Sequence, residues 1–70
     1  MKEPLTDKQS IILDTIKWFI STNGFSPSIR ELCALCNLSS SATMWVHLQN
    51  LKAKGYIDFD ERKMRTIRVL

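Results

Sequence analysis

The pair Cys33-x-x-Cys36 is the part of this 70-residue chain that most resembles a reactive motif. A redox dithiol needs its first cysteine at a helix N-terminus after a strand, and a structural zinc site needs a second pair of ligands. The chain has two cysteines in all, and both fall inside a short helical pattern beside Leu32 and Leu35. We therefore interpret them as small apolar core residues in a reducing compartment. We predict no enzymatic activity, no metal and no cofactor.

Basic side chains are concentrated in the C-terminal half of the chain. Residues 38–70 contain six lysines and arginines against three acidic residues, whereas residues 1–37 contain four of each. This distribution of a net charge of +3 fits a surface that binds a polyanion. A slightly basic surface without a partner is the alternative. The side chains that we expect to contact phosphate groups are Ser28, Lys52, Lys54, Arg62, Lys63 and Arg65.

Two helices joined by a short turn must position these side chains. The first is expected over residues 29–36, because Ser28 and Glu31 form a capping box in front of it. The second is expected over residues 41–54 and ends at Gly55, a residue suited to the left-handed conformation of helix ends. Such a pair is a helix-turn-helix, which places its second helix in the major groove of DNA.

An earlier helix supplies most of the expected core. Thr6 and Gln9 form a second capping box, and Gly24 marks the end of a helix over residues 6–23. Ile11 and Trp18 lie beside its apolar stripe and either widen the buried side, which we expect, or form an exposed patch. The core residues predicted for the three helices are Ile12, Leu13, Ile16, Phe19, Ile20, Ile29, Leu32, Cys36, Leu38, Met44, Leu48 and Leu51.

After Gly55 the spacing of apolar residues changes from a helical to an alternating pattern. Residues 56–59 and 66–70 alternate around the charged segment 60–65, which predicts a β-hairpin. The residues expected to face the helices are Ile57, Phe59, Ile67 and Val69. The fold predicted for this chain is mostly α with a small β-hairpin, a three-helix winged helix-turn-helix. Residues 60–65 would form a basic wing on the DNA backbone.

The length of the chain limits what it can contain. Residues 1–70 give room for a single domain with one modest core and no deep catalytic cavity. No apolar run approaches the roughly 20 residues of a membrane helix, and no signal peptide is recognisable at the N-terminus. We expect a cytoplasmic domain that uses neither a membrane nor a small-molecule substrate.

Short stretches from one end of the chain to the other resemble the DNA-binding domain of the LexA repressor family. They are Leu5-Thr6, Gln9, Ile16, Ile20-Ser21, Gly24, Pro27, Glu31, His47-Leu48, Leu51, Lys54-Gly55, Ile57 and Ile67-Arg68-Val69-Leu70. The resemblance implies a winged helix that binds palindromic operator DNA in a bacterial repressor of the SOS response.

In that family a C-terminal domain carries most of the dimerisation and a Ser-Lys self-cleaving peptidase activity. This chain ends at Leu70, before any such region. We therefore expect either a domain of a longer repressor or a small stand-alone protein. Binding as a homodimer would rest on a region outside this chain or on weak contacts.

The departures from the family lie in the second helix of the pair. In the family this helix typically begins with Ser-Pro-Asn and carries two consecutive glutamates before His-Leu. Here Ser41 and Ala42 replace the proline and the asparagine, and Trp45 and Val46 stand where the glutamates would be. We therefore expect an operator that differs from the family's usual one. The residues expected to face the bases are Ser40, Ser41, Ala42, Thr43, Trp45, Val46 and Gln49.

Individual contacts can be assigned to this face and to the wing. Gln49 is suited to pair with adenine, and Val46 and the methyl group of Thr43 are suited to contact thymine methyl groups. Lys63 and Arg65 are expected to contact phosphates. Their replacement by alanine should weaken binding to all sequences and flatten its salt dependence.

Trp45 leaves three interpretations open. It folds back over the helix or the wing as additional core, it makes an apolar contact with DNA, or it anchors another protein. Tryptophan is enriched in the residues that dominate protein interfaces. The last interpretation gives an alternative function, a protein-interaction module on a winged-helix scaffold. That module would use Trp45 and Val46 and would bind DNA weakly or not at all.

Overall fold

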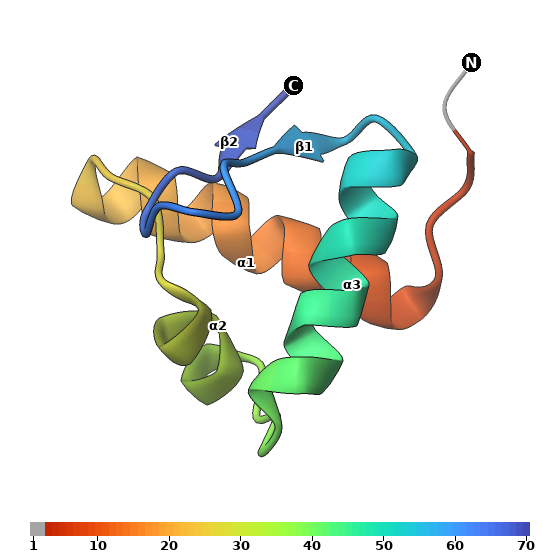
Figure 1. The fold of residues 1–70 in the computed structure, drawn as a ribbon, viewed down its shortest axis with the longest axis horizontal. Coiled ribbons are helices and arrows are strands. Elements are labelled where there is room, and N and C mark those ends of the chain that lie inside the picture. The colour runs from red at the N-terminus through yellow and green to blue at the C-terminus, as the bar shows by residue number, and fades with distance from the viewer. Residues whose placement is uncertain (1–2) are drawn as a thin grey trace.

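The computed structural model describes residues 3–70, so the first two residues of the predicted domain lie outside the described part. Three helices are followed by two short antiparallel strands (Figure 1). The predicted winged helix-turn-helix is confirmed. The elements are α1 (Asp7–Asn23), α2 (Ile29–Leu35), α3 (Ser41–Ala53), β1 (Ile57–Asp58) and β2 (Arg68–Val69).

Local sequence signals define where the helices begin and end. Both predicted capping boxes are present, with Thr6 and Gln9 at the start of α1 and Ser28 and Glu31 at the start of α2. Gly24 ends α1 in the left-handed conformation, at φ 79°. The helices predicted to end at residues 36 and 54 each end one residue earlier, because those residues are the C-caps.

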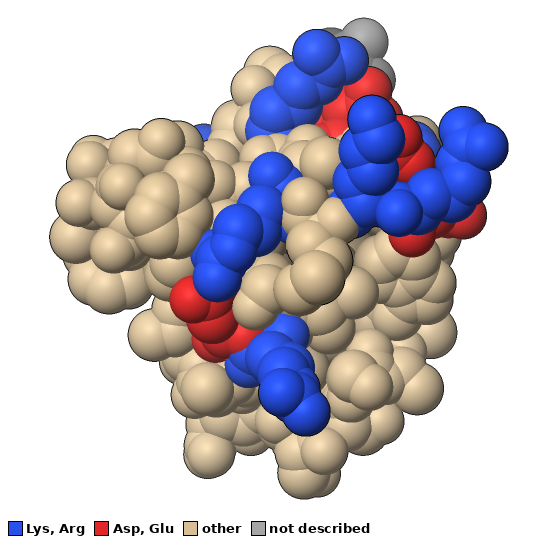
Figure 2. Space-filling view, turned by 60° about the vertical axis from the view of Figure 1, so that its left-hand side comes forward, with Lys and Arg blue, Asp and Glu red and all other residues tan. Residues whose placement is uncertain are grey.

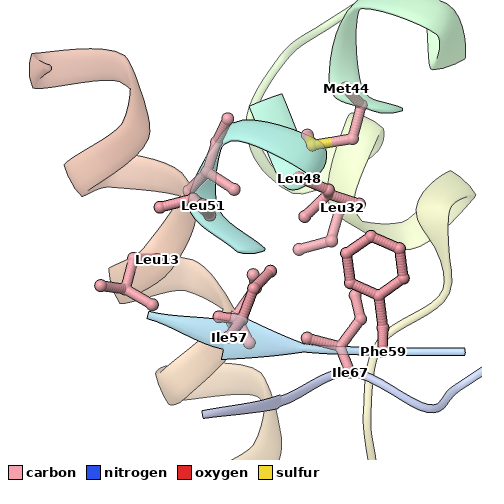
Figure 3. Packing of buried hydrophobic residues seen from close by; sticks show 10 residues of the cluster. Leu13, Leu32, Met44, Leu48, Leu51, Ile57, Phe59 and Ile67 are labelled. Atoms are coloured by element: carbon pink, nitrogen blue, oxygen red, sulfur yellow. The ribbon is translucent and has the colours of Figure 1, made fainter. Parts of the chain in front are cut away.

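One hydrophobic core lies between the three helices and the hairpin (Figure 3). Helix α3 packs against α1, α2 and β1, and its predicted core residues Met44, Leu48 and Leu51 are fully buried. Ile20, Ile29, Cys36 and Leu38 are partly buried at the edge of this cluster. The buried cluster consists of Ile12, Leu13, Ile16, Leu32, Met44, Leu48, Leu51, Ile57, Phe59 and Ile67.

The expectation that Ile11 and Trp18 widen the buried side of α1 is wrong. Their exposed fractions are 54% and 53%, because α2, α3 and the hairpin cover the side of α1 that carries Ile12, Leu13 and Ile16. Ile11 and Trp18 instead lie in a shallow surface depression together with Leu35 of α2.

The strands are shorter than the sequence predicts, and hydrogen bonding explains why. The backbone N–H of Ile67 donates to Ser26 Oγ at 3.0 Å, and the Asp60 N–H donates to Thr66 Oγ1 at 2.9 Å. These groups are therefore not available for a longer ladder. Val69 pairs with the buried Ile57 and therefore lies on the same, helix-facing side of the hairpin, as predicted. It is 37% exposed because it sits at the margin of the core, in a surface depression beside Ile20 of α1.

Candidate DNA interface

The buried side of α3, formed by Met44, Leu48 and Leu51, fixes which residues of this helix face solvent. Ser40 is the N-cap, and its Oγ accepts a hydrogen bond from the backbone N–H of Thr43 at 3.3 Å. The hydroxyl-bearing residues of the first turn are exposed. On the side opposite the core, Ala42, Val46 and Ala53 form what we term the outer face of α3, and all three are exposed.

Trp45 does not share the outer face with Ala42 and Val46. Its ring is half-buried and packs on the ring of Phe59, with 5.3 Å between the centroids. Trp45 thus belongs to the edge of the core, which is the first of the three interpretations made from the sequence. The sequence analysis places Trp45 among the residues that face the bases, whereas its ring lies against Phe59, the residue directly before residues 60–65.

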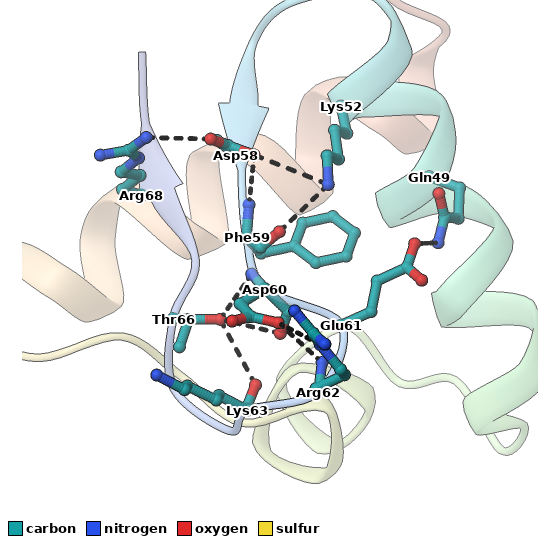
Figure 4. A network of polar contacts seen from close by, with 10 residues as sticks. All are labelled: Gln49, Lys52, Asp58, Phe59, Asp60, Glu61, Arg62, Lys63, Thr66 and Arg68. Carbon is teal, nitrogen blue, oxygen red and sulfur yellow. Dashed lines mark hydrogen bonds and ion pairs between the residues drawn. The ribbon is translucent and has the colours of Figure 1, made fainter.

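Gln49 is also engaged with the wing. Its side-chain Nε2 donates to Oε1 of Glu61 at 2.6 Å (Figure 4). The bond joins the middle of α3 to the wing, which we define as residues 60–65. An adenine contact by Gln49 would therefore be made by a side chain that Glu61 already orients.

Two of the predicted phosphate contacts, Lys52 and Lys54, are engaged within the protein. Lys52 Nζ donates to the Phe59 carbonyl at 3.1 Å and lies 3.6 Å from a carboxylate oxygen of Asp58 (Figure 4). Lys54 Nζ donates to the carbonyl of Pro4 at 3.0 Å and to Oε1 of Gln9 at 2.7 Å. These lysines connect the C-terminal part of α3 to β1 and to the start of α1.

Arg65 links the wing to the helix-turn-helix. Its Nη1 donates to the Ser26 carbonyl at 3.1 Å and to Oε1 of Glu31 at 2.7 Å, and the guanidinium lies over the ring of Phe25. The hydrogen bond from Arg65 lowers the pKa of Glu31 below its usual value of 4.5, and the backbone N–H of Ser28 lowers it further. Ser28 itself is buried, and its Oγ caps α2.

Arg62 and Lys63 are the predicted phosphate contacts that extend furthest into solvent. The side chain of Arg62 is 92% exposed and lies 3.8 Å from a carboxylate oxygen of Asp60. Lys63 is exposed, and its side chain points away from the polar network of the wing (Figure 4). Within residues 3–70, Lys63 forms no ion pair.

Arg30 is a cationic residue of this surface that the sequence analysis missed. It is exposed on the first turn of α2 and lines the same groove as Arg62 and Lys63, a hollow of about 270 Å³ between the wing and the two helices. Its position two residues after the Ser28 cap, in the first turn of the helix, was the available signal. It was overlooked because Arg30 lies in the half of the chain whose charges balance.

Apart from Arg30, Glu31 and Lys52, the helix-turn-helix is uncharged. Residues 32–51, which include the turn and most of α3, contain no Asp, Glu, Lys or Arg. In Figure 2 the Lys and Arg side chains, with acidic side chains among them, lie over the upper and middle part of the face, and the surface below them is uncharged. The candidate interface is therefore an uncharged helix face next to three cationic side chains, Arg30, Arg62 and Lys63, which we term the cationic rim.

Neither a membrane-spanning helix nor a metal cluster is found in the part of the chain that the structure describes. None of its helices is long and apolar enough to cross a membrane. Among residues 3–70 no group of three or more His, Cys, Asp or Glu side chains is placed to hold a metal ion. Cys33 and Cys36 are free thiols and are partly buried against the core.

Comparison with known proteins bears on this arrangement. The chain is 43% identical to the LexA repressor of Caldicellulosiruptor saccharolyticus over 70 residues, which cover all of this chain and 35% of that protein. It is 44% identical to the LexA repressor of Staphylococcus haemolyticus over 66 residues, 94% of this chain and 32% of that protein. The chain thus spans about a third of the length of these relatives. The LexA DNA binding domain model matches residues 2–66, and the chain belongs to this family.

Proposed function

We propose that this domain binds double-stranded DNA with α3 in the major groove and the wing on the phosphate backbone. The observation that carries the proposal is the exposed outer face of α3 beside the cationic side chains of Arg30, Arg62 and Lys63. A helix in this position meets base edges, while the neighbouring cations meet phosphates. Family membership supports the same conclusion.

The roles of the individual residues follow from their contacts. Arg30, Arg62 and Lys63 bind phosphates, and the hydroxyls of Ser41 and Thr43 reach phosphates or base edges at the N-terminus of α3, where the helix dipole also favours a phosphate. Ala42, Val46 and Gln49 face the bases. Ser40 and Ser28 act as helix caps, and Trp45, Lys52, Lys54 and Arg65 hold the wing and the N-terminal segment in place.

At the level of the whole protein, we propose that residues 1–70 form the single operator-binding domain of a LexA-like transcriptional repressor in the cytoplasm. Such a module buries only about 600–1,000 Å² on DNA, so useful affinity requires two copies on a palindromic operator. Dimerisation and a self-cleaving serine peptidase would belong to a region outside this chain. A protein-interaction module built on Trp45 is not favoured, because that ring is half-buried against Phe59.

A salt titration tests the role of the wing. The probe is a duplex selected by this domain from a random pool, with a scrambled duplex of the same composition beside it. The double variant Arg62→Ala with Lys63→Ala should bind both duplexes more weakly. Its plot of log affinity against log salt should be shallower by about one unit for each phosphate that the wing no longer neutralises.

The matched control for this titration is Lys8→Ala with Lys17→Ala, which removes the same charge from exposed positions of α1. It should leave the salt slope unchanged. Equal slopes for the wing variant and the unmodified domain would show that the wing does not contact the backbone. Failure of the domain to bind any duplex at about 50 mM salt would overturn the proposed function.

A further inference from the structure

The outer face of α3 is apolar where it is most exposed. Ala42, Val46 and Ala53 lie opposite the buried side of the helix, and Val46 is 58% exposed. A solvent-facing side of a helix normally carries charged or polar residues. The turn and α3 up to Leu51 also carry no Asp, Glu, Lys or Arg, because residues 32–51 contain none. A face of this kind can make few hydrogen bonds to base edges.

Three side chains near this face have partners within the protein. The Gln49 amide donates to Glu61, the Trp45 ring packs on Phe59, and the hydroxyl of Ser40 accepts the capping bond of α3. Ser41, Thr43 and Asn50 are exposed beside the face. On the face itself the side chains of Ala42, Val46 and Ala53 are small, so the α3 backbone can approach a ligand surface closely.

The cationic rim indicates which ligand covers this face. Arg30, Arg62 and Lys63 border the groove beside α3. Arg62 lies near Asp60, but within residues 3–70 neither Arg30 nor Lys63 forms an ion pair, so an uncharged apolar partner would leave these two cations without a counterpart. A DNA duplex supplies phosphates at the rim and base edges between them. In the major groove the C5-methyl group of thymine is the apolar group that distinguishes one base pair from another.

Resting on the proposed function, we infer that α3 selects its operator through thymine methyl groups, contacted by the side chains of Val46 and Ala42 and by the methyl group of Thr43. Val46 offers two methyl groups at the centre of the exposed length of α3. The domain should then prefer T·A base pairs at the operator positions that lie against these side chains. Bidentate hydrogen bonds from charged side chains of α3 have no part in it, because α3 carries no charged residue before Lys52.

Replacement of thymidine by deoxyuridine tests this inference directly. Deoxyuridine keeps every hydrogen-bonding group of thymidine and lacks only the C5-methyl group, so the change isolates the apolar contact. In the duplex selected by the domain, each thymidine is replaced in turn, and the dissociation constant is measured by fluorescence anisotropy. Each methyl group that α3 contacts should cost about a fourfold loss of affinity.

Val46→Ala assigns the contact to its side chain. This variant should bind the thymidine duplex more weakly and should lose the difference between thymidine and deoxyuridine at one or two positions. The control is Ile11→Ala, which shortens another exposed apolar side chain on a different helix and should keep the full difference. Circular dichroism confirms the folded state of both variants.

The possible outcomes separate the inference from the proposed function. Tight binding to the selected duplex with no loss at any deoxyuridine overturns the methyl contact and leaves DNA binding intact. Loss of affinity at deoxyuridine that persists unchanged in Val46→Ala overturns the assignment to Val46. Failure to bind any duplex overturns both. The measurement on the unmodified domain needs no variant, so it does not depend on how a substitution affects folding.

Discussion

Ser26 shows how much a single small residue contributes to this fold. It is buried, its Oγ accepts the backbone N–H of Ile67, and its own hydroxyl donates to the carbonyl of Pro27 at 3.1 Å. Its backbone carbonyl accepts a hydrogen bond from Arg65. Ser26 therefore connects the segment before α2 to the C-terminal arm of the hairpin, although its neighbours in the sequence mark it only as part of a connector.

Replacement of Ser26 by alanine should destabilise the domain. The Ile67 N–H would remain buried without its acceptor, and a buried polar group left without a partner costs about 1–3 kcal/mol. Urea unfolding followed by circular dichroism measures the change. Ser39→Ala, at an exposed position of the turn, is the control and should stay within about 0.5 kcal/mol of the unmodified domain. A Ser26→Ala variant as stable as this control would contradict the role of the bond.

Glu31 should make the stability of the domain depend on pH. Its pKa is lowered in the folded state, first by the hydrogen bond from Arg65, so its carboxylate favours folding above its unfolded pKa. This contribution disappears as the pH falls through the lowered folded value. Glu31→Gln keeps a side chain suited to the capping box and removes the charge. The unmodified domain should therefore be more stable than the variant at about pH 7 and equal to it at about pH 2.

Urea midpoints measured across this range provide the test. Asp14→Asn, which removes an exposed carboxylate from α1, controls for the change in net charge. A stability difference between Glu31→Gln and the unmodified domain that is the same at every pH would show that the ion pair with Arg65 does not stabilise the fold.

Among the elements, the wing is the one whose position depends on tertiary contacts. Glu61 accepts a hydrogen bond from Gln49, Arg65 bonds to Glu31 and to the Ser26 carbonyl, and Phe59, directly before the wing, packs on Trp45. The sequence predicts a hairpin here from alternating residues alone. The structure adds that the hairpin is anchored to both helices of the helix-turn-helix, which sets the groove between them.

The junction between α3 and β1 depends on the backbone conformation of Gly55. Its φ is 85°, and no atom lies within 4 Å of the place where a Cβ would stand. The cost of a side chain here is therefore conformational. Gly55→Ala should lower the free energy of unfolding by about 1–2 kcal/mol, and Gly55→Asn should lower it less, because asparagine tolerates the left-handed region better. Equal stability of Gly55→Ala and the unmodified domain in urea unfolding would contradict this reasoning.

In the molecule as a whole, Arg30, Arg62 and Lys63 lie at one rim of a largely uncharged helix-turn-helix. The domain that carries them is small. A module of this size on one half-site has limited contact area, and a second copy joined to it raises affinity through effective concentration alone. The arrangement of two copies on DNA is then set by the spacing of the half-sites.

Two copies of the domain joined by a flexible Gly/Ser linker should bind an inverted pair of half-sites about 100-fold or more tighter than one copy binds a single half-site. The half-sites should be about 10 base pairs apart, one turn of the duplex. Gel-shift titration measures both affinities. A duplex with one half-site scrambled is the control and should lose the gain. Equal affinity of the linked pair for the two duplexes would contradict binding as a pair.

The sequence by itself determined the elements and the fold. Capping boxes, helix-ending glycines and the change from helical to alternating spacing are local signals, and local backbone chemistry needs no distant partner. The side of α3 that faces the core could also be predicted from the sequence, because Met44, Leu48 and Leu51 share one side of the helix.

Only the tertiary structure decided which side chains are available to a ligand. Trp45, Lys54 and Arg65 carry the residue types expected at an interface, yet each has a partner distant in the sequence, in Phe59, Gln9 and Glu31. Arg30 is exposed beside the wing although the distribution of charge along the chain pointed elsewhere. Contacts between residues distant in the chain form only when the helices and the hairpin pack together, so they cannot be predicted from local spacing or from composition.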